Sequence, residues 1–385
     1  MAIYIDHCGT TPLAREVRDA MVAFMDSGAF ANPAAHHHAA GRAAYSAVET
    51  ARASIAAHLN AKPEWVHFAG GASEANNIVI HGFAKRFRLH GCRILVGATE
   101  HKSVLDSALD LKDSGFCTVE VLPVGKADGT IDLDVLAARL ADNPTQKPTL
   151  VAVMWCNNEV PARNPIEKIA DLCAQHGAFW HCDAVQGIVR EKCDVNALGA
   201  SSIVFAPHKI YGPKGIGVFI IPERNPMLRL EAPFQGGEQE RRLRPGTINS
   251  LAIVGAAAAM DLHERRRGEL VDHLRACDDA FIEVMKTKVR GFNLTIPQSQ
   301  KCPGIVNFYI ENVDAQSLVH EVSEKVCANR GASCSGAGGE KVRHVPAALG
   351  LPVEIAANVI RVSFGFASSV EDARTAAEIF AATAT

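Results

Sequence analysis

The sequence predicts an α/β fold: a mostly parallel β-sheet covered by helices on both faces, followed by a smaller α+β domain. Between about residues 50 and 250, short apolar runs rich in Val, Ile and Phe alternate with segments of helical spacing. This alternation is typical of a parallel sheet. From about residue 251 the pattern changes to longer charged or alanine-rich segments. The 385 residues are enough for two or three domain-sized units with a large core.

Six apolar runs in the first part have the length and composition of buried strands. They are Ile94–Val96, Val119–Leu122, Leu150–Trp155, Ala178–Cys182, Ile203–Ala206 and Ile216–Ile221. The clearest helix is Pro165–Gly177, where Pro165 suits the first helical position and Gly177 suits the C-terminal stop. Apolar side chains recur at helical spacing along this segment from Ile166 to Cys173.

The second part of the chain has fewer strand candidates. It opens with an alanine-rich apolar stretch, Leu251–Met260, and a long charged helix, His263–Lys288. The elements expected after these are a strand at Gly304–Ile310, a helix around Ala315–Ala328, a strand at Val359–Phe364 and a terminal helix from about Val370. This mixture predicts the smaller α+β domain.

Composition and charge exclude several classes of protein. The formal net charge of -3 gives no bulk attraction to nucleic acid or membranes. No apolar run approaches the roughly 18 residues of a membrane span, and the N-terminus lacks a secretory signal. The 11 cysteines are odd in number and form no C-x-x-C pair. We therefore expect free thiols, no structural zinc and a cytoplasmic protein.

Reactive side chains follow four of the predicted strands at the point where each strand ends. They are Thr99-Glu100-His101 after the first strand, Asn157-Asn158-Glu159 after the third, Asp183 after the fourth and His208-Lys209 after the fifth. Open α/β sheets bind ligands at the carboxyl ends of their strands. The sequence therefore predicts a functional site at this edge of the sheet.

A glycine turn, Gly70-Gly71-Ala72-Ser73, opens the helix candidate Glu74–His90. Such a turn is a common helix start, and its exposed N–H groups also suit a phosphate. It is neither a Walker loop nor the G-x-G-x-x-G fingerprint, which disfavours ATP and NAD. A phosphate cradle, a strand-end Asp and a strand-end Lys together suggest pyridoxal 5'-phosphate (PLP). That cofactor needs a lysine for its Schiff base and a carboxylate for its ring nitrogen.

These motifs resemble the cysteine desulfurases of the NifS/IscS type, which are class-V aminotransferases with the aspartate-aminotransferase-like PLP fold. The strongest blocks are Thr99-Glu100-His101, Asn157-Asn158-Glu159, Asp183-Ala184-Val185-Gln186, the run from His208 to Gly215, and the run from Gln239 to Thr247. The resemblance implies a seven-stranded, mostly parallel sheet in a large domain at 13–255, and a small domain formed by 1–12 and 256–385. It also implies a homodimer, L-cysteine as the substrate, and an acceptor for the sulfur such as an iron–sulfur scaffold or a thiolation enzyme, without direct nucleic-acid contact.

Carried over by position, the resemblance assigns cofactor residues. Lys209 would form the Schiff base, and Asp183 would pair with the pyridinium nitrogen. Gln186 would reach the phenolic oxygen, while His101 would stack on the ring and help move protons. The residues implied to hold the phosphate are Ala72, Ser73 and His208, joined by Thr247 from the other subunit.

The resemblance also assigns substrate residues and a nucleophile. Asn158 would contact both cofactor and substrate, Arg361 would hold the substrate α-carboxylate, and Asn32 would line the same pocket. Cys334, in the run Gly331-Ala332-Ser333-Cys334-Ser335, matches the sulfur-accepting cysteine of the family. As a thiolate it would attack the sulfur of the bound substrate, keep it as a persulfide and release alanine. No metal site is implied.

Several positions depart from the family pattern, and they favour a specialised desulfurase as a hypothesis. Pro207, Glu238, Arg242 and Pro245 replace small residues, and Asn329-Arg330 stand where serines are common. Two alternatives to a desulfurase stay open. One is a related PLP-dependent C–S or C–Se lyase that does not use Cys334. The other is a catalytically silent interaction partner that retains the fold.

Overall fold

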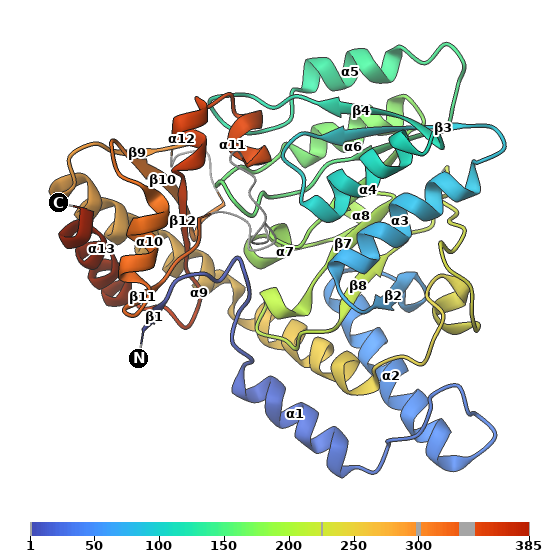
Figure 1. The fold of residues 1–385 in the computed structure, drawn as a ribbon. Coiled ribbons are helices and arrows are strands. Elements are labelled where there is room, and N and C mark those ends of the chain that lie inside the picture. The colour runs from blue at the N-terminus through green and yellow to red at the C-terminus, as the bar shows by residue number, and fades with distance from the viewer. Residues whose placement is uncertain (1, 225, 298–301, 331–342, 385) are drawn as a thin grey trace.

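The computed structural model of the chain describes residues 2–224, 226–297, 302–330 and 343–384. Figure 1 shows a larger part built on a seven-stranded sheet and a smaller part with two further sheets. Along the large sheet the strand order is β2-β8-β7-β6-β5-β3-β4. The strands are β2 (Val66–Ala69), β3 (Cys92–Gly97), β4 (Cys117–Leu122), β5 (Thr149–Ala152), β6 (Phe179–Asp183), β7 (Ser202–Phe205) and β8 (Gly217–Ile220).

The predicted mostly parallel seven-stranded sheet is confirmed. Strands β3 to β7 pair in parallel, and within this sheet, as far as the chain is described, only β8 runs antiparallel to its neighbours, β2 and β7. All six predicted apolar runs contribute strands to this sheet, although β5 ends at Ala152, before the predicted end at Trp155. Strand β2 was not predicted, because its four residues include His67, which interrupts the apolar pattern although it is buried.

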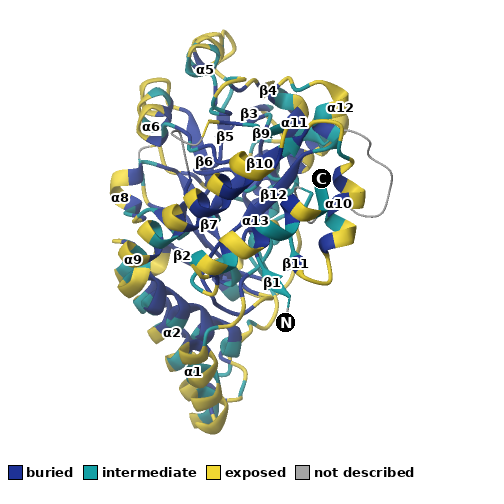
Figure 2. Cartoon of the chain, turned by 90° about the vertical axis from the view of Figure 1, so that its left-hand side faces the viewer, coloured by how far each residue is buried: buried dark blue, intermediate teal, exposed yellow. Residues whose placement is uncertain are grey.

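Helices cover both faces of the sheet, as the sequence predicts (Figure 1). Adjacent residues of β3 show the two faces: Leu95 packs into one hydrophobic core, whereas Ile94 and Val96 pack into another. In Figure 2 the strands are buried and the outer helix surfaces are exposed. The helices of this part are α1 (Arg15–Asp26), α2 (Ala39–His58), α3 (Ala72–Arg86), α4 (Lys102–Asp113), α5 (Leu133–Ala141), α6 (Ile166–Gln175), α7 (Gly187–Arg190) and α8 (Val195–Leu198), with 3-10 turns η1 (Pro63–Trp65), η2 (Pro207–Lys209) and η3 (Gln239–Arg242).

One long helix, α9 (Ser250–Lys288), joins the two parts. The sequence suggested two pieces there, and the structure makes them continuous. Residues from Ala252 to Leu262 pack into the core of the large sheet, and residues from Leu270 to Met285 pack into the core of the smaller part. The two cores thus separate inside α9, while the division at 255 and 256 stays a prediction.

The smaller part holds a three-stranded sheet, β12-β10-β9, and a two-stranded sheet, β1-β11. Its elements are β1 (Ile3–Tyr4), β9 (Phe292–Leu294), β10 (Ile305–Ile310), β11 (Val326–Cys327), β12 (Ile360–Ser363), α10 (Ala315–Val322), α11 (His344–Ala348), α12 (Val353–Ala357) and α13 (Val370–Ala384). The predicted helix around Ala315–Ala328 is too long. It ends at Val322 because Val326 and Cys327 pair with the N-terminal strand β1 instead.

The expectation that all cysteines are free is wrong for one pair. Cys92 and Cys117 form a disulfide, with their Cα atoms 5.1 Å apart. They begin the neighbouring parallel strands β3 and β4 and face each other in register, a proximity that their separation of 25 residues in sequence does not reveal. No helix of the described chain is long and apolar enough to cross a membrane.

Candidate active site

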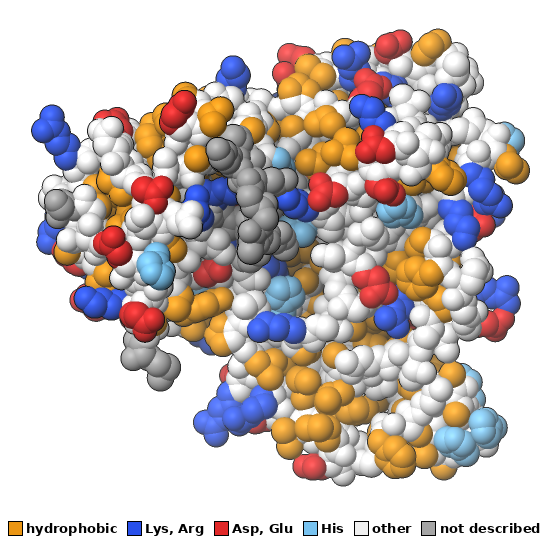
Figure 3. Space-filling view, in the orientation of Figure 1, with side chains coloured by type: hydrophobic (Ala, Val, Ile, Leu, Met, Phe, Trp, Pro, Cys, Tyr) orange, Lys and Arg blue, Asp and Glu red, His pale blue; other side chains and the backbone are white. Residues whose placement is uncertain are grey.

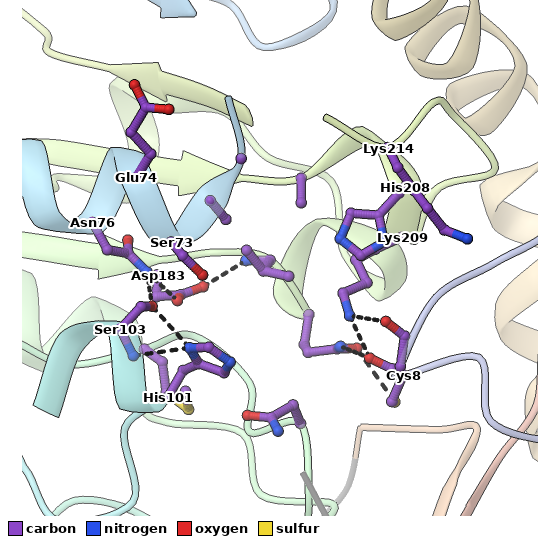
Figure 4. A pocket seen from close by; sticks show the side chains of 18 of the residues that line it. Cys8, Ser73, Glu74, Asn76, His101, Ser103, Asp183, His208, Lys209 and Lys214 are labelled. Atoms are coloured by element: carbon purple, nitrogen blue, oxygen red, sulfur yellow. Dashed lines mark hydrogen bonds between the residues drawn. The ribbon is translucent and has the colours of Figure 1, made fainter. Parts of the chain in front are cut away.

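A cavity of about 580 Å³ lies at the carboxyl ends of the parallel strands, between the two parts of the molecule. Figure 3 shows histidine and basic side chains gathered in the hollow between these parts. The cavity brings together most of the residues that the sequence assigned to one site (Figure 4). These lining residues are Ala72, Ser73, His101, Asn158, Asp183, Gln186, His208, Lys209 and Arg361.

Lys209 reaches the cavity from η2, the 3-10 turn that follows β7. Pro207 opens this turn, where its fixed φ angle and missing N–H fit. The Nζ atom of Lys209 donates to the carbonyl oxygens of Cys8 at 2.5 Å and Gly9 at 2.7 Å. The N-terminal segment therefore orients the amine in the cavity through neutral oxygen atoms (Figure 4).

Asp183 ends β6 and is almost completely buried. One oxygen, Oδ2, accepts from the Asn76 side chain at 2.9 Å, and Oδ1 accepts from the backbone N–H of Val185 at 3.0 Å. Behind it, Oδ1 of Asn76 pairs with Nε2 of His181 at 3.1 Å. Burial lowers the pKa of His181 to about 3, so that ring stays neutral and donates to Asn76. Two donors thus fix the carboxylate in one orientation.

His101 caps the N-terminus of α4. Its Nδ1 atom accepts from the backbone N–H of Ser103 at 3.1 Å and lies 2.8 Å from the Ser103 hydroxyl. Since Nδ1 is an acceptor, the neutral ring carries its proton on Nε2. Asn76 also donates to the hydroxyl of Ser103 at 2.9 Å. A continuous set of hydrogen bonds therefore joins His101 to Asp183 through Ser103 and Asn76 (Figure 4).

The N-terminus of α3 forms the opposite wall of the cavity. Its N-cap, Gly71, provides no side-chain cap, so backbone N–H groups of the first turn face the cavity. Glu74 accepts from the backbone N–H of Gly70 at 2.8 Å and from Arg244 Nε at 2.8 Å. Gly217 of β8 allows the start of α3 to lie this close to the sheet, because a Cβ atom on residue 217 would lie 2.3 Å from the carbonyl carbon of Gly71.

His208 lies beside this wall. Its Nδ1 atom is 3.0 Å from the Thr10 hydroxyl. Burial, followed by the nearby charges of Lys209 and Lys214, lowers the pKa of His208 to about 4. The ring is therefore neutral at physiological pH and can hydrogen-bond to an anionic group without adding positive charge.

Arg361 enters the cavity from β12, and its side chain is 1% exposed. It pairs with Asp6 and donates to the carbonyl oxygen of Asn158 at 2.8 Å. Its Nε atom is buried and has no hydrogen-bond partner in the described chain. Gln186 lies deeper, where its Oε1 atom accepts from Arg190 at 2.9 Å and lies 3.5 Å from the sulfur of Cys8.

The structure does not bring every assigned residue to this cavity. Within one chain, Asn32 lines a second cavity of about 420 Å³ with Arg52, His67 and Glu240, and its assignment to the pocket of Arg361 stays a prediction. Thr247 does not line the cavity of its own chain, and its assignment to the other subunit stays a prediction. Cys334 lies outside the described residues.

Sequence reasoning missed two polar residues of this site. Asn76 and Ser103 make the link between His101 and Asp183, and both lie near the starts of helices that begin at the cavity. The only available signal for them was this position near a helix start, which does not distinguish capping from function. Glu100, named in the strand-end run before His101, is buried and accepts from the backbone N–H of Met154 at 2.8 Å. Burial raises the pKa of Glu100.

The arrangement fits pyridoxal 5'-phosphate. Space for a phosphate exists at the α3 N-terminus, where a Cβ added to Gly71 would meet no atom within 4 Å. A fixed, buried carboxylate at Asp183 suits a protonated ring nitrogen, and Lys209 presents an amine in the same cavity. Asn158 and Arg361 stand on the wall contributed partly by the smaller domain.

Comparison with known proteins agrees with this geometry. The family model of aminotransferase class V matches residues 3–375. The cysteine desulfurase IscS of Neisseria meningitidis is 34% identical over 378 residues, which cover 98% of this chain and 91% of that protein. The cysteine desulfurase IscS of Pectobacterium carotovorum is 34% identical over 373 residues, 97% of this chain and 90% of that protein.

Solved structures extend the likeness to the whole fold. A NifS-like protein superposes with a TM-score of 0.89 at 26% identity and covers 99% of both chains. SspA in complex with cysteine superposes with a TM-score of 0.79 at 28% identity, covering 94% of this chain and 99% of that one. The chain therefore belongs to the aminotransferase class-V family and, within it, to the cysteine desulfurases.

Proposed function

We propose that this cysteine desulfurase binds pyridoxal 5'-phosphate, converts L-cysteine to L-alanine and holds the sulfur as a persulfide on Cys334 for transfer to an acceptor. The observation that supports this most is the single cavity that gathers Lys209, Asp183 and His101 under the N-terminus of α3. None of these side chains alone would distinguish a desulfurase from another strand-end site. Together they match the needs of the cofactor in one place.

When bound, the cofactor supplies an electron sink for the carbanion formed at the substrate α-carbon. In this proposal Lys209 attaches the cofactor, and Asp183, fixed by Asn76 and Val185, keeps the ring nitrogen protonated. His101 carries a proton on Nε2 and delivers or accepts it near the ring. Arg361 aligns the carboxylate of L-cysteine, since its unpartnered Nε atom offers a donor beside the cavity.

Phosphate binding is proposed to involve Ala72, Ser73 and His208 within one chain. A homodimer would add Thr247 from the other subunit. Apolar side chains are exposed on and beside α1 and α2, with Phe30 88% exposed and Met25 56% exposed. Such a patch supports the proposal that the other subunit covers this surface.

We also propose a cytoplasmic location and an acceptor that is a protein or a pathway enzyme. Eight described cysteines are free, and a reducing compartment preserves such thiols. The disulfide between Cys92 and Cys117 is the exception to this pattern.

The test compares wild type, Lys209→Ala and Cys334→Ala with L-cysteine and a reductant, measuring alanine, sulfide and the visible absorbance of the cofactor-loaded protein. We expect Lys209→Ala to lose the absorbance of the lysine-bound cofactor. Cys334→Ala should keep that absorbance and make almost no alanine. Cys327→Ala, which removes another free cysteine, is the matched control and should behave as wild type.

Two outcomes would favour the alternatives. If Cys334→Ala releases alanine as fast as wild type, the persulfide on Cys334 is wrong and a lyase that does not use this thiol is favoured. If the wild type neither takes up the cofactor nor releases sulfide, the chain is a silent partner that retains the fold.

A further inference from the structure

Three arginine side chains gather beside the active-site cavity. Arg361 lines the cavity, and a β-bridge between Asn329 and Arg361 places Arg330 next to it. Arg343 joins them by donating to the carbonyl oxygen of Val359 at 2.6 Å, two residues before Arg361. Burial, and then the charges of Arg330 and Arg361, lower the pKa of Arg343 to about 10, although Glu159 opposes the shift. Positive charge is thus concentrated at this point.

Each of the three guanidinium groups keeps one buried nitrogen without a hydrogen-bond partner in the described chain. These atoms are Nε of Arg330, Nη1 of Arg343 and Nε of Arg361. Among residues that the structure describes, no other guanidinium has such an atom. A buried donor without an acceptor costs about 1–3 kcal/mol, and more when charged. Three of them in one cluster therefore indicate a place for an anionic acceptor.

Neighbouring carboxylates of the described residues balance the charge of the cluster only in part. Asp6 pairs with Arg361. Arg330 donates instead to the neutral side chain of Gln316 at 2.9 Å and to a backbone carbonyl. No ion pair within 4.0 Å joins Arg330 or Arg343 to a carboxylate of the described residues. Arg330 and Arg343 therefore have no carboxylate of the described residues in direct contact, and Glu159 acts on Arg343 only from beyond 4.0 Å.

The cluster is also adjacent in sequence to the cysteine that is proposed to carry the sulfur. Arg330 and Arg343 directly flank the segment 331–342 in sequence, which contains Cys334. The residue after Arg343, His344, pairs through Nε2 with the carbonyl oxygen of Glu100 at 2.8 Å, next to His101.

We propose that Arg330 and Arg343 form a second oxyanion subsite, separate from the carboxylate position assigned to Arg361, that binds an acidic group of the sulfur acceptor. This inference rests on the proposed persulfide at Cys334. L-Cysteine has one carboxylate, which Arg361 accounts for, so the other two guanidinium groups are not needed for the substrate. Planar guanidinium groups suit carboxylate or phosphate oxygens, which accept two hydrogen bonds at once.

The transfer step is balanced without an added oxidant. The sulfur of the acceptor thiol attacks the outer sulfur of the persulfide, and the S–S bond to Cys334 breaks. The electron pair of that bond stays on the sulfur of Cys334, which takes up the proton lost by the acceptor thiol. The products are the free thiol of Cys334 and a persulfide on the acceptor.

The experiment uses the holoenzyme with L-cysteine and compares an anionic thiol, mercaptosuccinate, with a neutral one, thioglycerol. The measured quantity is kcat/KM for forming the persulfide of mercaptosuccinate divided by kcat/KM for forming that of thioglycerol. Differences between variants in folding or in cofactor content cancel in this ratio. We expect Arg330→Gln and Arg343→Gln each to lower this ratio about tenfold, as loss of a charged hydrogen bond predicts. Arg330→Lys and Arg343→Lys should restore part of it, and the exposed Arg275→Gln should leave it unchanged.

A second arm identifies the source of the acidic group. It replaces the small thiols with the peptides Asp-Cys-Asp and Ser-Cys-Ser. If the enzyme prefers the acidic thiol over the neutral one only among the small thiols, the acceptor is a metabolite. If it prefers the acidic peptide over the neutral one and shows no such preference among small thiols, the acceptor is a protein. If neither ratio changes in the Arg330 and Arg343 variants, the subsite is wrong. If no alanine forms with any thiol, the proposed function has failed instead.

Discussion

At the scale of single residues, Asn76 is the connecting group of the site. It is 1% exposed, and its amide bonds Asp183, Ser103 and His181 at once. We expect Asn76→Leu, which keeps the size and removes these bonds, to weaken cofactor affinity and lower kcat by roughly 10–100-fold. The reason is that Asp183 and His181 would each lose a buried partner, at about 1–3 kcal/mol per group. Fluorescence titration with pyridoxal 5'-phosphate and the pH profile of kcat measure the effect.

Asn164→Leu is the control for that change. Asn164 is also buried, at 4% exposed, and its amide bonds the backbone of Met154 and Ile131 without lining the cavity itself. We expect it to lower the melting temperature as much as Asn76→Leu, without moving cofactor affinity or the pH profile. Equal cofactor affinity in the two variants would show that Asn76 only supports the fold.

At the scale of elements, the close packing of β8 on the start of α3 sets the position of the helix N-terminus. A Cβ atom on Gly217 would lie 2.3 Å from the carbonyl carbon of Gly71 and 2.7 Å from the backbone nitrogen of Ala72. These are backbone atoms, so relief requires α3 to move. We expect Gly217→Ala to lower cofactor affinity at least about tenfold and to lower the melting temperature, both measured on purified protein.

Gly268→Ala provides the matched change in α9. A Cβ atom there meets nothing within 4 Å, and alanine favours a helix over glycine by about 1 kcal/mol. The melting temperature should therefore stay the same or rise, with cofactor affinity unchanged. An unchanged affinity in Gly217→Ala would mean that α3 does not depend on this contact.

Element positions were predictable where a pattern was local. Apolar runs and the polar residues after them located the parallel strands and the side of the sheet that holds Lys209 and Asp183. The end of α10 was not predictable, because a pairing with β1, some 320 residues away in sequence, competes with helical propensity. The same limit applies to Asn76, whose partners come from two separate segments, the start of α4 and strand β6.

At the scale of the whole molecule, the active site depends on both hydrophobic cores. Its lining includes residues that precede α9 in the sequence, such as Asp183, and Arg361, which follows α9. Buried histidines then link the stability of the assembled fold to pH. Burial lowers the pKa of His67 and of His181 to about 3, and that of His263 to about 4. Each would titrate near 6.5 in an unfolded chain.

Between pH 6.5 and 4 the unfolded chain therefore binds protons that the folded chain does not bind. The free energy of unfolding consequently falls as the pH drops through this window, by up to about 1.4 kcal/mol per pH unit for each such histidine. We expect His263→Gln, which removes one of them at the junction of the two cores, to flatten the pH dependence of unfolding by about one proton. Urea unfolding at pH 7.5, 6 and 5 measures the slope, and the pH 7.5 values report the cost of the substitution itself. A slope as steep as that of wild type would mean that His263 is already protonated in the folded enzyme.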